Sequence, residues 1–365
     1  MEKNNNFYFE LLEFIVNSMF NQYHDNYSVA RFGREKKPYT LFDRIVKFFG
    51  FIKNEKIDIS KIIHNSSGLI ENAEYLYNIL EDDYSKKLLI KVLSYRLLGY
   101  KKVKLPMNDD RYFKNIAAID NNIIDKNIFI DSGFRNWKLF LFNLNQFGFP
   151  CRMYYTPSGI YHKFVYRSYE YKNNKTIIKA EKGDHIIDAG ACWGDTALYF
   201  SVMSGFEGKV YSFEFLPRNV DIFQKNLSIN PDLKDRVELI QKPLWSSSDV
   251  DVFCNNNGPG NSVTFDNKYS GESYKTITID DFVNSNDIKK INFIKMDIEG
   301  AELEALKGAA NTLKNNKPAL AISIYHKKND FRDIPQYINS LDLGYKFYFD
   351  HYSIHHEESV LFARV

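Results

Sequence analysis

Four carboxylates and one histidine stand directly after short apolar runs that are typical of buried strands. They are Asp188, Glu214, Asp297, Glu299 and His326. In a doubly wound α/β sheet, ligands bind beyond the carboxyl ends of the strands, and these five residues come from four separate strands. We therefore expect the fold to bring them to one rim and to form an enzyme's active site there.

The last three of these residues are the candidate catalytic groups. His326 is a candidate base because its ordinary pKa lies near neutrality, and Asp297 and Glu299 could orient it. A hydroxyl is a poor nucleophile at neutral pH, so its alkylation needs a base or a metal ion. The same three side chains could instead hold a divalent ion, either Mg²⁺ or a transition metal. We favour base catalysis without a metal. The plainer alternatives are that Glu299 is only a charge that stabilises a helix N-terminus and that His326 is only a polar residue at the end of a strand.

The segment 185–200 predicts a strand, a tight turn and a helix. Asp188 ends the apolar run, and Gly190 and Gly194 follow it, so the backbone can turn sharply and approach a ligand. The spacing D-x-G-x-x-x-G differs from the dinucleotide fingerprint G-x-G-x-x-G. It suits S-adenosylmethionine, which has no phosphate and whose ammonium group an acid can bind. An ordinary strand, turn and helix is the alternative.

The next predicted strand, 209–215, carries an acid near its end. Glu214 is placed there to accept hydrogen bonds from both hydroxyls of a ribose. The turn and this acid together predict an adenosine-binding site, although they do not by themselves exclude NAD.

From residue 183 onward the pattern alternates between strands and helices. Strands are expected at 185–190, 209–215, 237–240, 291–296, 319–325, 347–349 and 360–363, and helices at 194–204, 217–228, 302–313 and 334–341. We expect a mostly parallel sheet with one antiparallel strand at the end. Antiparallel strands at 249–254 and 276–280 are expected to flank a loop at 255–262 that could cover the active site.

The first half of the chain divides into two predicted parts. Residues 1–115 read as a helical accessory domain, with helices at 39–50, 73–80 and 84–98 and an apolar face formed by Phe9, Leu12, Phe14, Ile15 and Met19. Residues 116–182 read as a β-rich connecting segment, with a helix at 137–147 and a hairpin over 151–166. The alternating run 166–171 could line a substrate mouth or form an edge strand. Residues 183–365 are the predicted catalytic domain.

Composition restricts the choice of partners and compartment. The net charge of +2 gives no strong case for binding nucleic acid or an anionic membrane. Three widely spaced cysteines form neither a zinc motif nor a disulfide framework. The start lacks a signal peptide and no apolar run is long enough to span a bilayer. We expect a cytoplasmic protein with reduced thiols and a small-molecule or saccharide partner, and an oligomer is possible.

Three segments resemble the FkbM family of methyltransferases. They are 188–196 (DAGACWGDT), 213–214 (FE) and 295–302 (KMDIEGAE), the last followed by 325–327 (YHK). The resemblance covers roughly residues 160–365. It implies a class I, Rossmann-like methyltransferase sheet and a mainly helical N-terminal region before it. It also implies an S-adenosylmethionine-dependent O-methyltransferase whose acceptor is a sugar, a glycan such as a cell-surface polysaccharide, or a related small molecule.

The resemblance assigns roles to particular residues. The cofactor positions that carry over are Asp188, Gly190, Gly194, Asp195 and Glu214, and the active-site segments supply Asp297, Glu299 and His326. Ala191 and Leu244 are further candidates for binding the cofactor. An NAD-dependent oxidoreductase is disfavoured because the dinucleotide fingerprint is missing. A non-catalytic nucleotide-binding scaffold is disfavoured because acids remain at every relevant strand end. The identity of the acceptor and of the methylated hydroxyl stays open.

Overall fold

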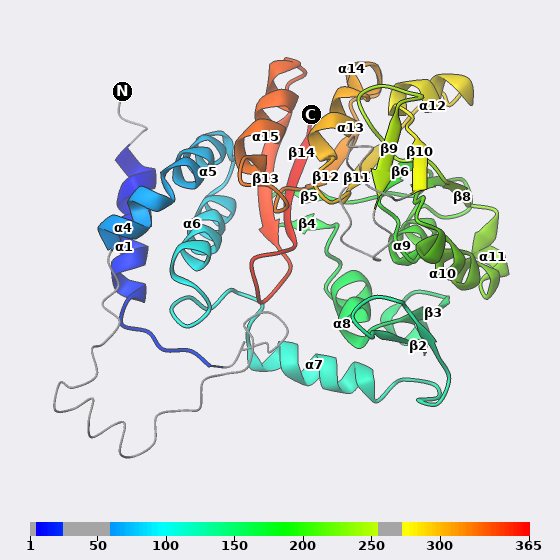
Figure 1. Ribbon diagram of the computed structural model, residues 1–365, viewed down its shortest axis with the longest axis horizontal. Helices are drawn as coiled ribbons and strands as arrows, with labels where there is room; N and C mark the ends of the chain where they lie inside the picture. Colours follow the sequence, from blue (N-terminus) through cyan, green and yellow to red (C-terminus); the bar gives the residue numbers. More distant parts are fainter. Residues whose placement is uncertain (1–4, 25–58, 255–271) are drawn as a thin grey trace.

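The computed structural model describes residues 5–24, 59–254 and 272–365 of the 365-residue chain (Figure 1). The helix expected at 39–50 and the loop expected at 255–262 lie outside these described residues. No helix within them combines the length and the apolarity that crossing a bilayer requires.

Seven strands form one central sheet in the order β13-β14-β12-β11-β6-β7-β8. The strands are β6 (His185–Ala189), β7 (Lys209–Phe213), β8 (Val237–Ile240), β11 (Phe293–Met296), β12 (Ala319–Ser323), β13 (Lys346–His351) and β14 (Ser359–Arg364). All neighbouring pairs are parallel except those of β14, which is antiparallel to both β12 and β13. The predicted fold class, a mostly parallel sheet with an antiparallel last strand, is confirmed.

Helices cover both faces of this sheet. They are α9 (Asp195–Ser204), α10 (Pro217–Ser228), α11 (Pro231–Lys234), α12 (Ile279–Ser285), α13 (Glu302–Lys307), α14 (Ala310–Asn316) and α15 (Asp330–Ser340). Successive strand side chains point to opposite faces, so Ile187 of β6 packs with α12 to α15 while Ile186 packs with α9. Burial on both faces explains the near-continuous apolar runs that mark these strands in the sequence.

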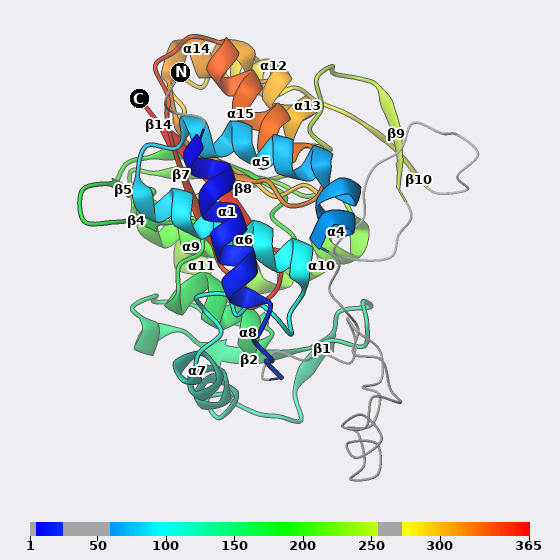
Figure 2. The same cartoon turned by 90° about the vertical axis from the view of Figure 1, so that its left-hand side faces the viewer.

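The N-terminal helices pack beside the β13 edge of the sheet (Figures 1 and 2). They are α1 (Asn5–Ser18), α4 (Ile59–Asn65), α5 (Ser67–Ile79) and α6 (Asp83–Leu98). The buried stripe of α1 is Phe7, Leu11 and Ile15, because these three side chains face α6. The expected face is therefore corrected: Phe9 and Leu12 are exposed. The proposed division of the chain at residue 115 stays a prediction.

Residues 110–178 form a further group of elements, of which those up to residue 165 lie below the carboxyl edge of the sheet in Figure 1 and the last two strands lie beside β13 and β14. Its elements are α7 (Asp110–Asp120), β1 (Phe129–Asp131), β2 (Lys138–Asn143), the 3₁₀ turn η1 (Asn145–Phe147), β3 (Arg152–Tyr155), α8 (Pro157–Ile160), the π-helix η2 (Tyr161–Val165), β4 (Tyr171–Lys172) and β5 (Ile177–Ile178). Strands β1, β2 and β3 form an antiparallel sheet, and β4 pairs with β5.

Three predictions for this group of elements are wrong. The expected helix at 137–147 is mainly the central strand β2, because β1 and β3 satisfy its backbone on both sides. The second half of the expected hairpin is helical, since Thr156 caps α8 by accepting from Gly159 N and Pro157 stands in its first turn. The expected edge strand at 166–171 is interrupted by the positive φ of Arg167.

The insertion after β8 also differs from the prediction. Strand β9 (Asp251–Cys254) pairs with β10 (Glu272–Lys275), not with the expected strand at 276–280. That stretch instead begins α12, because the hydroxyl of Thr278 accepts a hydrogen bond from Asp281 N at 2.9 Å. The helix expected at 302–313 is divided into α13 and α14.

The order of strands reverses between β6 and β11, which makes their carboxyl ends the expected ligand-binding position. The loops that follow these two strands touch there. A Cβ added to Gly190 would lie 1.9 Å from the carbonyl oxygen of Asp297, and φ of Gly190 is +80°. Only glycine allows this approach.

Replacing Gly190 by alanine should destabilise the protein strongly, because Asp297 is fixed by strand β11. Gly148→Ala is the matched control, since its φ is +84° but nothing lies within 4 Å of the added Cβ. In urea unfolding we expect the control to lose about 1 kcal/mol of unfolding free energy and Gly190→Ala roughly 3 kcal/mol or more. Equal losses would show that the two loops can separate freely.

Candidate functional site

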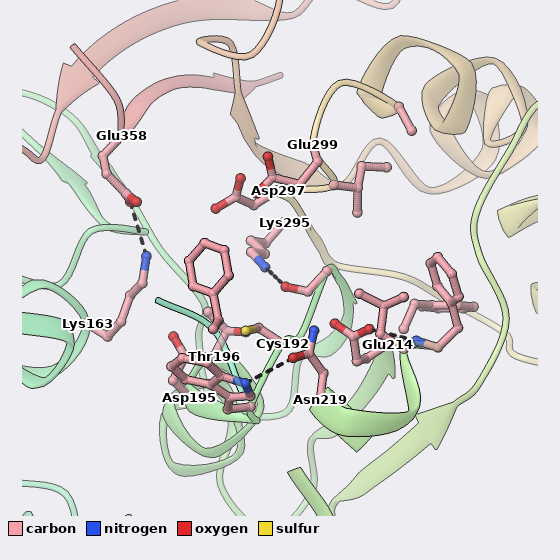
Figure 3. A pocket seen from close by; sticks show the side chains of 18 of the residues that line it. Lys163, Cys192, Asp195, Thr196, Glu214, Asn219, Lys295, Asp297, Glu299 and Glu358 are labelled. Atoms are coloured by element: carbon pink, nitrogen blue, oxygen red, sulfur yellow. Dashed lines mark hydrogen bonds and ion pairs between the residues drawn. The ribbon is translucent and has the colours of Figure 1, made fainter. Parts of the chain in front are cut away.

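A cavity of about 690 Å³ opens over the carboxyl ends of β6, β7 and β11. Figure 3 shows Glu214 and Asn219 on one side, Lys163 and Glu358 on the other, and Lys295 and Asp297 between them. The lining includes Arg135, Trp137, Tyr155, Lys163, Tyr169, Gly190, Asp195, Glu214, Leu244, Asp297, Glu299, Tyr325 and Glu358. The topology thus brings residues more than 200 positions apart to one cavity.

The cavity gathers most of the residues singled out in the sequence. Gly190, Asp195, Glu214, Leu244, Asp297 and Glu299 belong to its lining. Asp188, Ala191, Gly194 and His326 are outside that lining. Asp188, Ala191 and Gly194 are buried, and His326 is half-buried beside Asp297 and Glu299.

Glu214 is a carboxylate held at the end of β7 by the start of α10. Its Oε1 accepts hydrogen bonds from the backbone N–H groups of Phe215 and Leu216, both at 2.9 Å. The residue is only 7% exposed. Burial raises the pKa of Glu214 to about 7 although those hydrogen bonds act to lower it. The group is therefore a poorly hydrated acceptor, ready to exchange water for a ligand's hydroxyl groups.

Asp188 forms a buried ion pair instead of facing the cavity. Lys295 Nζ lies 3.1 Å from its Oδ1, and the two side chains are 1% and 0% exposed. The Thr196 hydroxyl lies 2.9 and 2.8 Å from the two carboxylate oxygens. Lys295 also donates to the carbonyls of Ala189 at 3.1 Å and Gly190 at 2.7 Å. The pair joins β6 to β11 beneath the glycine turn.

Asp195 begins α9 at the floor of the cavity. The Tyr155 hydroxyl donates to its Oδ2 at 2.9 Å. Burial raises the pKa of Asp195, although Lys163 and Lys295 counteract part of this effect. Tyr155 comes from β3, so the small antiparallel sheet helps to close the cavity.

Asp297 is a carboxylate held by two tyrosines. Tyr169 donates to Oδ2 at 3.0 Å and Tyr325 donates to Oδ1 at 3.1 Å. Burial acts to raise the pKa of Asp297, but His326 and the two nearby lysines more than offset it and hold the pKa below its ordinary value. Asp297 is therefore a fixed anion at neutral pH.

Glu299 faces the cavity from a strained backbone position. Its φ is +56°, a left-handed conformation that is uncommon for glutamate. Its side chain is 38% exposed. Burial and the neighbouring Asp297 raise the pKa of Glu299 to about 7. Of the three expected catalytic side chains, this one combines access to the cavity with a pKa near neutrality.

His326 lies between carboxylates on both sides of its ring. Nδ1 is 2.9 Å from Glu302 Oε1, and Nε2 is 3.4 Å from Asp297 Oδ1 and 3.5 Å from Glu299 Oε2, although none is aligned as a hydrogen bond. Burial lowers the pKa of His326, but the carboxylates overcome this and raise it to about 9. The ring is therefore protonated at neutral pH. The expected role of His326 as the base stays a prediction, and its contacts with Asp297 and Glu302 suit a residue that positions Asp297.

One group of side chains has the geometry to hold a metal ion. Ligand atoms of Asp297, Glu302 and His326 all lie within 4.8 Å of one another. This set replaces Glu299 of the expected set by Glu302. Two carboxylates and one imidazole suit a divalent ion, and the buried Nδ1 and Nε2 atoms of His326 and Oε2 of Glu302 have no aligned hydrogen-bond partner.

Lys163 and Glu358 form the wall opposite Glu214 (Figure 3). Lys163 stands on the π-helix η2, and its Nζ lies 3.3 Å from Glu358 Oε2 and 3.4 Å from the Tyr169 hydroxyl. Burial lowers the pKa of Lys163, but Glu358 and Asp195 outweigh it and raise the pKa. Neither residue belongs to a local motif, so no signal in the sequence marks them.

Other functional residues had a signal that could have been used. Lys295 and Glu302 lie inside the quoted segment KMDIEGAE, and a lysine within a buried strand indicates a buried ion pair. Tyr325 directly precedes His326. Tyr169 lies in the alternating run for which a substrate mouth was one of two alternatives, and it does line the cavity.

Helix α6 supports the wall that carries Glu358. The Tyr95 hydroxyl lies 3.2 Å from His355 Nδ1, and Arg96 Nη2 donates to the carbonyl of His356 at 3.3 Å. Residues 356–358 line the cavity. The N-terminal helices therefore contact the segment between β13 and β14 that shapes the site.

The sheet order, the single antiparallel strand and a cavity over the strand switch point define the class I methyltransferase fold. Residues 180–347 match the family model of the methyltransferase FkbM domain. The resemblance inferred from the sequence is confirmed, and the domain is a methyltransferase.

Two curated relatives agree with this assignment. Hexuronic acid methyltransferase AglP of Haloferax volcanii is 27% identical over 186 residues, which cover 49% of this chain and 74% of the relative. Methyltransferase sdnD of Sordaria araneosa is 27% identical over 187 residues, covering 42% of this chain and 71% of the relative.

A solved structure supports the fold alone. It is methyltransferase FkbM from Methylobacillus flagellatus, with a TM-score of 0.52 and 20% identity. The similarity covers 88% of this chain and 65% of that one.

Removing Lys295 should destabilise the protein, because Asp188 would keep a buried charge without its cation. For Lys295→Met we expect a loss of about 3–5 kcal/mol in urea unfolding. Lys289→Met is the control, since the ion pair of Lys289 with Asp287 is 80% and 81% exposed and should contribute less than about 1 kcal/mol. The double variant Asp188→Asn/Lys295→Met should recover much of the lost unfolding free energy. If the losses of the two single variants simply added in the double variant, the two residues would not be energetically coupled.

Proposed function

We propose that the protein is an S-adenosylmethionine-dependent O-methyltransferase that acts on a hydroxyl of a sugar or glycan. The observation that carries this proposal is one cavity with two chemically different ends. A poorly hydrated carboxylate, Glu214, lies at one end, and the side chains of Asp297 and Glu299 lie towards the other. The similarity to a protein named as a hexuronic acid methyltransferase supports a saccharide acceptor.

The residues at the Glu214 end fit the cofactor. Backbone N–H groups of Phe215 and Leu216 donate to Glu214 Oε1, and the Asn219 side chain and the Cys192 N–H also hydrogen-bond to this carboxylate. In this proposal the ribose hydroxyls bind at the acceptor positions of the carboxylate that face the cavity. Phe215 and Leu244 offer apolar surface to an adenine, and Gly190 keeps the turn free of a Cβ. Asp195 is the acid of the lining nearest the glycine turn in sequence and is suited to the ammonium group.

Asp188 has a different role in this proposal from the one expected. Its carboxylate is committed to Thr196 and Lys295 and has no exposed surface. It therefore fixes the turn that holds the cofactor, and Ala191 and Gly194 shape the same turn from behind.

At the acceptor end, Glu299 is the proposed base. When bound, S-adenosylmethionine supplies an electrophilic methyl group and a neutral thioether leaving group. Glu299 accepts the proton of the acceptor hydroxyl, because it faces the cavity and titrates near neutrality. Asp297 orients that hydroxyl, and the charged His326 and the hydroxyls of Tyr169 and Tyr325 keep Asp297 ionised and in place.

Glu214→Gln should weaken binding of S-adenosylhomocysteine roughly tenfold or more, since a charged acceptor of two ribose hydroxyls is lost. Calorimetric titration measures this, with Glu207→Gln as the control because Glu207 is exposed and outside the cavity lining. Wild-type affinity should also fall as the pH drops below about 7, where Glu214 gains a proton. Unchanged affinity in Glu214→Gln would remove the ribose assignment.

Glu299→Gln should lower the rate of methyl transfer about 100-fold or more while leaving S-adenosylhomocysteine binding nearly unchanged. For the wild type, kcat should rise with pH and level off above about 7, because Glu299 must be ionised to accept a proton. Glu304→Gln is the control, since Glu304 stands on α13 outside the lining. A variant that keeps the wild-type rate and pH profile would exclude Glu299 as the base.

A further inference from the structure

We propose that the acceptor is a neutral sugar or an amino sugar, not a uronic acid, and that Lys163 and Glu358 together recognise two adjacent polar groups on its ring. This inference rests on the proposed methyltransferase function and names the substrate class of the same cavity. It distinguishes this chain from the relative named for hexuronic acid.

The charge of Lys163 is already balanced. Its side chain is 10% exposed, and Nζ is 3.3 Å from Glu358 Oε2. A lysine ammonium has three N–H donors, of which Glu358 and the Tyr169 hydroxyl take two. One donor is left for a hydroxyl oxygen of the acceptor. A ring carboxylate would have to displace Glu358 to gain a full ion pair.

Glu358 is fixed beside this donor. Its φ is +65°, and its carbonyl accepts a hydrogen bond from Tyr352 N at 2.9 Å. The side chain is 27% exposed, and a carboxylate has about four acceptor positions, so the ion pair leaves capacity for a hydroxyl or an ammonium group. A donor and an acceptor side by side match a vicinal diol or an amino alcohol.

The surroundings of this pair are acidic. Asp195, Asp297 and Glu299 share the lining, and Lys295 is already committed to Asp188 and two carbonyls. A further carboxylate would add negative charge to a partly desolvated space, which is unfavourable, whereas an ammonium group would be attracted.

Among the described residues, Arg135, Lys242 and His356 also contribute basic side chains to the lining. Lys242 adjoins Pro243 and Leu244 on the cofactor side of the lining. Arg135 lies with its guanidinium 4.9 Å from the centroid of the Phe134 ring, in the turn between β1 and β2. His356 Nε2 lies 3.6 Å from Glu357 Oε1.

Aromatic rings complete the surface that a sugar would contact. Trp137 is 42% exposed, and its ring stands edge-on to Trp193 at 6.4 Å between centroids. Trp193 in turn packs edge-on to Tyr155 at 5.9 Å. The apolar C–H face of a pyranose can pack on such rings while its hydroxyls reach the Lys163 and Glu358 pair.

The test uses full-length protein, S-adenosylmethionine with a radiolabelled methyl group, and three p-nitrophenyl β-pyranosides: glucoside, glucosaminide and glucuronide. We expect label in the glucoside or the glucosaminide at a rate at least about tenfold above that in the glucuronide. Glu358→Gln should reduce the ratio of the rate with the glucoside or glucosaminide to the rate with the glucuronide several-fold, because it removes one negative charge. Glu181→Gln, an exposed residue outside the lining, should leave the ratio unchanged.

Each other outcome decides against the inference. A glucuronide that is the best of the three acceptors overturns it, and so does an unchanged ratio in Glu358→Gln. Transfer to none of the three, with intact calorimetric binding of S-adenosylhomocysteine, overturns this acceptor class while the cofactor assignment stands. Loss of S-adenosylhomocysteine binding in the wild type would instead refute the proposed function itself.

Discussion

A buried lysine at the strand switch point supports the rest of this site. Lys295 of β11 reaches across to β6, where it pairs with Asp188 and donates to the carbonyls of Ala189 and Gly190. A buried ammonium group is stable only when all of its N–H donors have acceptors. Lys295 has one carboxylate and two carbonyl groups as acceptors. The contact fixes the glycine turn against the loop that carries Asp297 and Glu299. Every polar group in the cavity is placed relative to those two loops.

The carboxylates of the cavity are tuned to different states by their surroundings. Glu214 and Glu299 are poorly solvated, and the pKa of each is raised to about 7. Asp297 receives two tyrosine hydroxyls and faces a protonated histidine, so its pKa stays low. Similar side chains can therefore serve as a ribose acceptor, a base and a fixed anion within one cavity.

The cavity is assembled from segments that are distant in sequence and in architecture. The methyltransferase FkbM domain contributes the switch-point loops, but Lys163 and Tyr169 come from the layer before it and Glu358 from the segment after β13. Helix α6 contacts the same segment through Tyr95 and Arg96. The N-terminal part of the chain is thus mechanically connected to the wall that, in our proposal, selects the acceptor.

Most of the parallel sheet could be predicted from the sequence. Strands buried on both faces are continuous apolar runs, and turn residues mark their ends, so the predicted bounds of β6, β7, β8 and β11 lie close to the observed ones. The layer of residues 116–182 was predicted poorly. Its strand β2 is rich in Phe and Leu, which fit a helix or a strand equally well, and only pairing with β1 and β3 decided between them.

The sequence by itself determined the class of fold, the glycine turn and the acids that follow the strands, because these are local consequences of burial and backbone geometry. Only the tertiary structure decided what those acids do. It turned Asp188 away from the cavity, placed His326 between carboxylates that raise its pKa, and brought Lys163 to Glu358 across 195 positions. Charge state and pairing depend on distances and solvation between remote segments, and no spacing within the sequence records them.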